Sequence, residues 1–259
     1  LQNIPIRTEE GREIRKAFVT RSEDWLLLSA DYSQIELRVL AHISGDESLI
    51  RAFQDGADIH RETASEIFGV EPEEVTPNMR RHAKVINFGI AYGMSSFGLA
   101  TDLGISRNEA DAYIEKYFQR FSGVKRYMDE IVERAEKEGF VTTILKRRRY
   151  IPDIRSRNFH RRNFARRTAI NTPIQGSAAD LMKMAMLNVY NKIREENFRA
   201  RLLLQVHDEL VLEVHREELK EVAEVLKREM ENVAELKVPL VVEVQVAENW
   251  KDREDYTEN

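Results

Sequence analysis

The chain has 259 residues, of which 42% are hydrophobic and 33% are charged, and its formal net charge is −5. This length and apolar content can bury a sizeable core, in one large domain or in two lobes. The sequence has no cysteine, which excludes disulfides and thiolate metal sites, and no apolar run approaches the roughly 20 residues that cross a bilayer. We therefore expect a soluble protein with no membrane partner.

The first half of the chain predicts two short strands and then a series of helices. Strand-like apolar runs, separated by polar turn residues, cover 17–19 and 25–30. Helix-start and helix-stop signals, such as Thr76 before Pro77, then mark the helical segments. In chain order, helices are expected after Ser33, over 58–68 up to Gly69, from Pro77, from the Ser106–Glu109 capping box, and from about 124 to Gly139.

The second half returns to strands after a long helix. That helix is expected from Ser177 to about Glu195, and a further helix over 216–232. Strand-like runs cover 202–206, 210–214 and 238–246. Strands thus gather at both ends of the sequence and helices fill its middle. The predicted fold is α+β, an antiparallel sheet with a mostly helical lobe inserted.

Acidic residues stand at the ends of two predicted strands. Asp208 and Glu209 interrupt the apolar run 202–214, and Asp31 follows the apolar segment LLLSA. An unpaired carboxylate is expensive to bury, so we expect a hairpin tip to carry the first two. If both strands share one sheet, Asp31 meets Asp208, and the two repel each other unless a cation lies between them. Taken alone, Asp31 is better explained as a helix cap and Asp208 as a turn residue. Taken as a pair, the two favour a site for Mg²⁺ ions positioned for phosphoryl transfer.

Residues 146–167 form a basic segment in an otherwise acidic chain. The segment holds ten Lys or Arg and one acid, Asp153. It is interleaved with Tyr150, Phe159 and Phe164, which could stack on bases. A solvated run of charge is the alternative, but a basic stripe with aromatic rings favours a polyanion site.

The predicted helix after Pro77 carries two cations and two aromatic rings at four-residue intervals. These residues are Arg80, Lys84, Phe88 and Tyr92. Each step of four residues drifts only about 40° around a helix, so all four share one face, which would suit a triphosphate beside a base and sugar. The alternative is an ordinary amphipathic helix with the rings in the core. Against it, Ile86 and Ile90 already supply another apolar face.

Three segments resemble the signature motifs of family A DNA polymerases, the bacterial DNA polymerase I type. They are DYSQIELR at 31–38, RRHAKVINFGIAYG at 80–93 and QVHDELVLE at 205–213. Three other segments resemble further sequence blocks of the same family: LQNIPIR at 1–7, DIHRETA at 58–64 and NTPIQGSAADLMK at 171–183. The six blocks follow one another in order over nearly the whole chain. The resemblance is therefore specific, whereas HDE alone would mean little.

The resemblance implies the palm and fingers of a right-hand polymerase. The palm would comprise 1–40 and 172–259, and the fingers 41–171. The thumb and any exonuclease domain would be absent from this chain, so a second chain or fragment carrying the thumb and the upstream palm is a possible partner. The implied activity is template-directed DNA synthesis on a primer 3′ end, with primer–template DNA and deoxynucleoside triphosphates as partners. A bacterial or phage-like protein of this kind would act in the cytoplasm, at the nucleoid.

The resemblance also implies roles for individual residues. Asp31, Asp208 and the backbone carbonyl of Tyr32 would hold two Mg²⁺ ions, for which Mn²⁺ could substitute. Glu209 and Lys84 would complete the catalytic set. The nucleotide-binding residues would be Arg80, Lys84, Phe88, Tyr92, His60, Gln34 and Glu36. DNA would be contacted by Arg167, Asn171, Gln175 and His207, and the basic segment adds Arg147, Arg148 and Arg149.

Glu36 is implied to be a steric gate against a ribose 2′-hydroxyl. It also has capping-box spacing from Ser33, and both roles can hold together. A single-subunit RNA polymerase or a reverse transcriptase would share the two aspartates, but Glu36 and the helix motif at 80–93 argue against both. A two-metal nuclease would need no nucleotide-gripping helix. A non-catalytic nucleic-acid-binding fragment, which needs a separate thumb-bearing chain for activity, is the remaining alternative.

Overall fold

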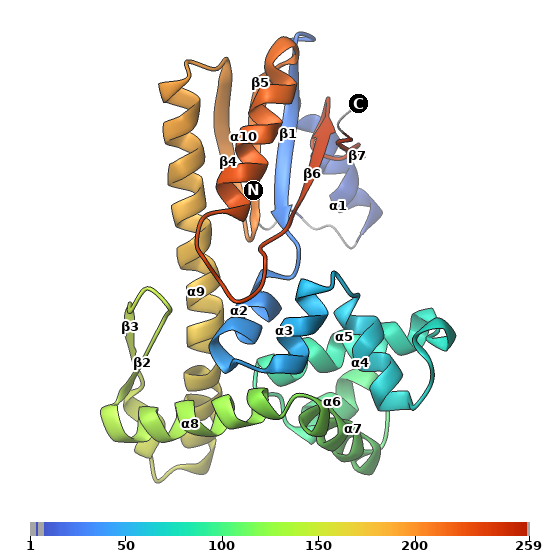
Figure 1. Ribbon diagram of the computed structural model, residues 1–259, viewed down its shortest axis with the longest axis vertical. Helices are drawn as coiled ribbons and strands as arrows, with labels where there is room; N and C mark the ends of the chain where they lie inside the picture. The colour runs from blue at the N-terminus through green and yellow to red at the C-terminus, as the bar shows by residue number, and fades with distance from the viewer. Residues whose placement is uncertain (1–3, 5–7, 258–259) are drawn as a thin grey trace. The chain divides into compact units, whose positions relative to one another are not determined.

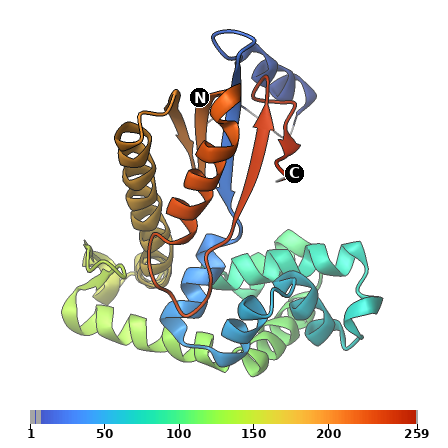
Figure 2. The same ribbon diagram turned by 45° about the horizontal axis from the view of Figure 1, so that its top comes forward.

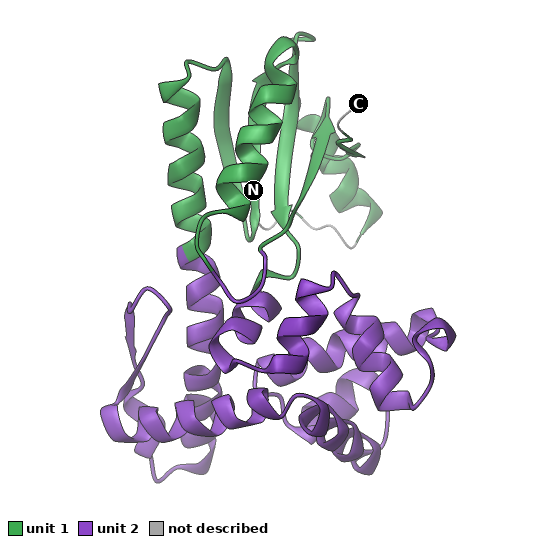
Figure 3. Cartoon of the chain, in the orientation of Figure 1, with its two compact units in different colours: residues 1–35, 181–235, 240–259 green, residues 36–180, 236–239 purple. Residues whose placement is uncertain are grey.

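The computed structural model describes residue 4 and residues 8–257, and it divides the chain into two compact units (Figure 3). Unit 1 comprises 1–35, 181–235 and 240–259, and unit 2 comprises 36–180 and 236–239. Of the sequence block at 1–7, only residue 4 lies within the described residues. Each unit mixes helix and sheet, as the α+β prediction requires.

Unit 1 is built on a five-stranded antiparallel sheet. Its strands run in the spatial order β4-β5-β1-β6-β7. Their bounds are Trp25–Tyr32 for β1, Ala200–Val206 for β4, Glu209–His215 for β5, Val242–Ala247 for β6 and Glu254–Asp255 for β7. Strands from the two ends of the sequence therefore lie side by side, as predicted (Figure 1).

One face of this sheet is covered by helix α10, Leu219–Glu231 (Figure 1 and Figure 2). Tyr32 belongs to that face, because its hydroxyl donates to the Met230 carbonyl at 2.6 Å. Side chains alternate along a strand, so Asp31 and Ser29 point to the opposite face. There Leu27 packs with Trp250, and the sheet's acids collect at the end of β1.

Shorter elements complete unit 1. They are helix α1, Glu9–Ile14, and the 3-10 turns η1, Arg15–Ala17, and η4, Arg216–Glu218. The predicted strand at 17–19 is wrong. Ala17 ends η1, and Val19 forms only an isolated bridge to Asn249. The apolar signal there comes from Phe18, whose ring packs edge-on against Trp250 at 5.5 Å.

Unit 2 is mostly helical. Its helices are α2, Ile35–Ser44, of which Ile35 belongs to unit 1, α3, Glu47–Gln54, α4, Ile59–Phe68, α5, Pro77–Ala91, α6, Ser96–Leu103, α7, Arg107–Arg120, and α8, Ser122–Glu138. The 3-10 turns η2, Pro72–Glu74, and η3, Pro152–Arg155, and a hairpin of β2, Phe140–Thr142, and β3, Arg148–Tyr150, join them.

Local sequence signals set most of these helix ends. Thr76 accepts a hydrogen bond from the Met79 amide at 3.3 Å, and the Ser106–Glu109 capping box is present. The capping box expected between Ser33 and Glu36 stays a prediction. Gln34 has a φ of 56°, so helix α2 begins only at Ile35.

Helix α9, Phe159–Glu195, is much longer than predicted and contains the boundary between the two units. The prediction began at Ser177 because Pro173 and Gly176 interrupt the helical pattern. Hydroxyls inside the helix bond to carbonyls one turn earlier, as when Thr172 donates to Thr168 at 2.7 Å. A helix-breaking residue is thus accommodated within a continuous helix.

None of the helices within the described residues is both long enough and apolar enough to cross a membrane.

We predict that Gly123→Ala destabilises unit 2. The Gly123 amide donates to Asp46 Oδ2 at 2.7 Å, while Asp46 Oδ1 caps α3 through the Leu49 amide at 3.0 Å. A Cβ at position 123 would lie 2.8 Å from Asp46 Cα, so backbone must move, at a cost of about 1–3 kcal/mol. Urea unfolding measures the loss. Gly98→Ala is the matched control, because its Cβ meets first the flexible Met94 side chain; equal stability of the two variants would contradict the prediction.

Candidate active site

The acids of the first and last sequence motifs meet in unit 1. Asp31 on β1 is the register partner of Glu209 on β5, and the Tyr32 amide donates to the Asp208 carbonyl at 3.1 Å. The turn between β4 and β5 contains His207 and Asp208, and His207 has a φ of 54°. The hairpin tip therefore carries Asp208, as the sequence predicts, whereas Glu209 is the buried first residue of β5, and both lie beside the end of β1.

Mutual repulsion is visible in the pKa of Asp31. Asp31 keeps a solvent-exposed side chain, yet partial burial and the nearby charges of Asp208, Glu209 and Glu243 raise its pKa to about 7, with Arg253 opposing the shift.

A divalent ion fits this donor set. Carboxylate oxygens are the ligands that Mg²⁺ prefers, and Mg²⁺ keeps several positions for water or phosphate. Among residues 4 and 8–257, no group of three or more His, Asp or Glu side chains is arranged to enclose a metal ion. Asp31 and Asp208 at the ends of their strands would offer carboxylate oxygens of this kind at an open site.

In unit 2, helix α5 presents the predicted face of cations and rings. Lys84 is exposed and Phe88 is half-buried, whereas Ile86 and Ile90 on the other face are buried. The Phe88 and Tyr92 ring centroids are 6.3 Å apart. Both rings are thus partly buried rather than enclosed in the core.

Arg80 on this face is tied to the cap of the neighbouring helix. Its Nε donates to Asp58 Oδ2 at 2.6 Å, and Asp58 also caps α4 through the His60 and Arg61 amides. Hydrogen bonds and charge from Arg80 hold the pKa of Asp58 below its usual range although burial opposes them. The guanidinium is therefore held in place in the free protein, with part of its charge compensated.

His60, a predicted nucleotide-binding residue, is almost fully buried in the structure. It is 2% exposed, and the Asn87 side-chain amide donates to its Nδ1 at 2.9 Å. Asn87 in turn accepts from Thr63 Oγ1 at 3.1 Å. Burial lowers the pKa of His60 to about 4, assisted by Arg80 and Lys84 and opposed by Asp58. Any contact with a nucleotide would therefore use a neutral ring, and sequence reasoning missed Asn87, which fixes that ring.

Glu36 and Tyr92, two of the predicted nucleotide-binding residues, are in contact. The Tyr92 hydroxyl, just after α5, donates to the Glu36 carboxylate in the first turn of α2. Gln34 Oε1 and Asn171 Oδ1, from two of the other predicted site residues, are buried and have no hydrogen-bond partner among the described residues.

The basic segment is divided between ion-paired and exposed arginines. Arg147 Nε donates to Asp180 at 2.8 Å and its Nη2 to the Gly176 carbonyl at 3.1 Å. Arg148 and Arg149 are exposed on β3, and Arg148 lies 4.8 Å from the centroid of the Phe140 ring. The interleaved rings of Tyr150, Phe159 and Phe164 are 61–69% exposed, as stacking on bases would require.

Three further predicted DNA contacts share one face of α9. Arg167, Asn171 and Gln175 lie at four-residue intervals on this helix. A Cβ added at Gly93 would lie 3.3 Å from Arg167 Cγ, so α9 passes close to the end of α5. His207 lies apart from them in sequence, in the β4–β5 turn of unit 1.

Unit 1 thus carries strand-end aspartates on an antiparallel sheet, and unit 2 carries a helix with cations and rings on one face. Comparison with known proteins shows the family to which this arrangement belongs. The model of DNA polymerase family A matches residues 1–252, and the chain belongs to this family.

Individual relatives support the assignment. The chain is 58% identical over 252 residues to DNA polymerase I of Geobacillus stearothermophilus and 55% identical to that of Bacillus subtilis strain 168. These alignments cover 97% of this chain and 29% of each relative, so the chain spans under a third of their length. A similar solved structure is the POL domain of Pol1 from M. smegmatis in complex with DNA primer-template and dNTP. Its TM-score is 0.93 at 49% identity, over 97% of this chain and 44% of that one.

We predict that His60 makes stability depend on pH. Its folded pKa of about 4 lies below its ordinary 6.5, so between these values the unfolded chain binds more protons and stability falls as pH falls. From pH 7 to pH 5 this effect costs about 2 kcal/mol in unfolding free energy. Urea unfolding at both pH values should show a smaller loss for His60→Gln. His160→Gln, at an exposed histidine, is the control and should lose as much stability as the unmodified chain between the two pH values. If His60→Gln loses as much unfolding free energy as the control, His60 is not the source of the pH dependence.

Proposed function

We propose that this chain is the palm and fingers portion of a DNA polymerase, which adds deoxynucleotides to a primer 3′ end under the direction of a template. The observation that carries the proposal is the meeting of Asp31 with Asp208 and Glu209 at the ends of β1 and β5. Membership of the family and the likeness to a POL domain described with DNA and dNTP support it.

In this proposal the palm comprises 1–40 and 172–259 and the fingers comprise 41–171. The compact units run close to these limits, since unit 2 begins at Glu36 and its main segment ends at Asp180. The partners are primer–template DNA, deoxynucleoside triphosphates and a second chain or fragment that carries the thumb and the upstream palm. The relatives named above are bacterial polymerases, and we expect action at the nucleoid in a bacterial cytoplasm.

The palm unit supplies the acids. Asp31, Asp208 and the Tyr32 carbonyl would hold two Mg²⁺ ions, or Mn²⁺ in their place. The chemistry that such ions would supply is activation of the primer hydroxyl and stabilisation of the charge on the leaving pyrophosphate. Glu209, the register partner of Asp31, is the auxiliary acid near the primer end. The pKa of Asp31, which burial and then its acidic neighbours raise, is consistent with a cation site, because a cation would relieve the part of the shift that is due to repulsion.

The fingers unit supplies the nucleotide contacts. Arg80 and Lys84 bind the triphosphate, and their positive charge favours departure of pyrophosphate. The Phe88 ring stacks on the incoming nucleotide, and Tyr92 lies at the template position. His60 and Gln34 lie near the triphosphate in this proposal, and Gln34 comes just before this unit in the chain. Because His60 is neutral, it can offer only a hydrogen bond or a ring contact.

DNA contacts come from α9, the β4–β5 turn and the β2–β3 hairpin. Arg167, Asn171 and Gln175 follow the primer–template, and His207 reaches the primer end. Arg148 and Arg149 bind phosphates, whereas Arg147 contributes less because Asp180 compensates its charge. These assignments rest on the sequence motifs and on the exposure of the side chains.

The decisive test replaces the aspartates in the full-length protein. Asp31→Ala or Asp208→Ala should reduce primer extension by about 10³-fold or more, because charge stabilisation of the transition state is lost, while primer–template affinity changes little. Glu243→Gln is the matched control, since Glu243 is the other register partner of Asp31 but lies outside the sequence motifs. Near-normal extension by either aspartate variant would refute the assignment. DNA binding without extension by the unmodified protein would favour the non-catalytic alternative.

Sugar selection gives a second test. Glu36→Ala should raise ribonucleotide incorporation relative to deoxynucleotide incorporation by about tenfold or more, because a carboxylate that excludes the 2′-hydroxyl is removed. Tyr92→Phe removes the hydroxyl that holds Glu36 but leaves the carboxylate, so its effect should be smaller. The ratio of kcat/KM for the two sugars is measured beside thermal unfolding. A loss of stability with unchanged selectivity would leave Glu36 with a structural role only.

A further inference from the structure

The C-terminal segment continues past the part of the chain that the family shares. The family match ends at residue 252, and the structure describes the chain to residue 257. Beyond the match, β7 pairs with β6, and the Tyr256 amide donates to the Val244 carbonyl at 2.9 Å. The segment therefore adds an edge strand to the sheet that carries the acids.

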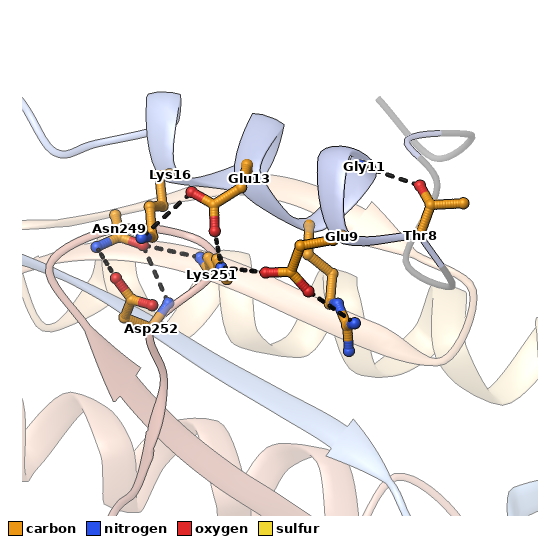
Figure 4. Close-up of polar contacts among 9 residues, drawn as sticks. Thr8, Glu9, Gly11, Glu13, Lys16, Asn249, Lys251 and Asp252 are labelled. Carbon is orange, nitrogen blue, oxygen red and sulfur yellow. Dashed lines mark hydrogen bonds and ion pairs between the residues drawn. The ribbon is translucent and has the colours of Figure 1, made fainter.

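The same segment is anchored on the side that precedes β7 (Figure 4). Lys251 forms ion pairs with Glu13 and, at 3.6 Å, with Glu9, both on α1. The Asn249 side chain accepts from the Lys251 and Asp252 amides at 3.0 Å. Trp250 is 2% exposed, and its amide donates to the Phe18 carbonyl at 3.0 Å. Residue 253 is thus fixed from both directions along the chain.

Arg253, between these two anchors, reaches the acid next to the proposed metal ligands. Its Nη1 donates to Glu209 Oε1 and lies 3.5 Å from Ser29 Oγ, while its Nε donates to the Trp250 carbonyl at 3.0 Å. Only 17% of the Arg253 side chain and 9% of the Glu209 side chain are exposed. Ser29 lies two residues before Asp31 on β1, so the guanidinium holds Glu209 from the side away from the strand end.

We propose that Arg253 is a positioning residue for nucleotidyl transfer, which holds the Glu209 carboxylate on the sheet so that it does not join Asp31 and Asp208 as a third metal ligand. The inference rests on the proposed function. A glutamate released beside two aspartates would add a negative donor and strengthen ion binding, but it would then be displaced from the primer end. Arg253 instead keeps it ion-paired at a fixed place.

A second arginine–glutamate pair on the same sheet face provides a matched comparison. Arg21 donates to Glu213 through its backbone amide and its Nε, each at 2.9 Å, and Glu213 is 6% exposed. Glu213 lies four residues after Glu209 on β5, opposite Leu27 and away from Asp31. If Arg253 only stabilised the fold, loss of either arginine would have the same consequences.

The experiment compares Arg253→Gln with Arg21→Gln in the full-length protein. Mn²⁺ affinity of the nucleotide-free protein is measured by electron paramagnetic resonance, and kcat and nucleotide KM by primer extension. Arg253→Gln should raise Mn²⁺ affinity about fivefold, because a nearby positive charge is removed and a carboxylate is released. It should lower kcat about tenfold with little change in KM. Arg21→Gln should change only thermal stability, and Arg253→Lys should restore much of kcat.

A double variant shows whether the effect passes through Glu209. In a Glu209→Gln background, Arg253→Gln should cause no further loss of kcat, and its gain in Mn²⁺ affinity should be smaller, because only the removal of the positive charge remains. A further loss there, or equal behaviour of the Arg253 and Arg21 variants, would overturn the proposal. Failure of the unmodified protein to extend a primer when the thumb-bearing chain or fragment is present would refute the proposed function instead, while the Mn²⁺ measurements would still decide whether Arg253 restrains Glu209.

Discussion

The antiparallel register of β1 with β5 is the constraint on which the site depends. It places Asp31 opposite Glu209, and the same register buries Leu28 opposite Leu212 on the face covered by α10. Because side chains alternate along a strand, a slip of one residue would turn the acids into the core and the leucines away from it. The apolar packing of the sheet therefore fixes the positions of the charged groups, and the hydrogen bond from Tyr32 to Met230 secures the same register from the other face.

Concentrating acids at the end of a sheet has a cost, and unit 1 offsets only part of it. Arg253 compensates Glu209, whereas Asp31 keeps a pKa raised to about 7 by burial and by its acidic neighbours. Unit 2 shows the complementary arrangement, in which Asp58 holds Arg80. In each unit, one charged side chain of the candidate site is thus held by a partner of opposite sign, so that this side chain need not be ordered from a mobile state when a ligand binds.

Sequence reasoning succeeded where a short stretch of chain carries its own signal. The cap at Thr76, the hairpin before Glu209 and the shared face of α5 each follow from residues close in sequence. It failed where the outcome depends on distant contacts. Pro173 suggested a break in a helix that the surrounding chain keeps continuous, and Phe18 indicated a strand because its partner, Trp250, comes from the other end of the chain.

Charge is the property that sequence alone estimates least well. The basic segment at 146–167 was correctly expected to carry exposed rings and arginines, but its local charge overstates what it can offer to phosphates. Asp180 compensates Arg147 at 2.8 Å, and Glu136 compensates Arg166 at 2.9 Å, and both acids lie outside the segment. The pairing of Arg253 with Glu209 likewise joins residues 44 positions apart. A charge pattern in the sequence therefore locates a basic surface for a polyanion. How strongly that surface attracts a polyanion depends on which acids the fold brings next to its arginines.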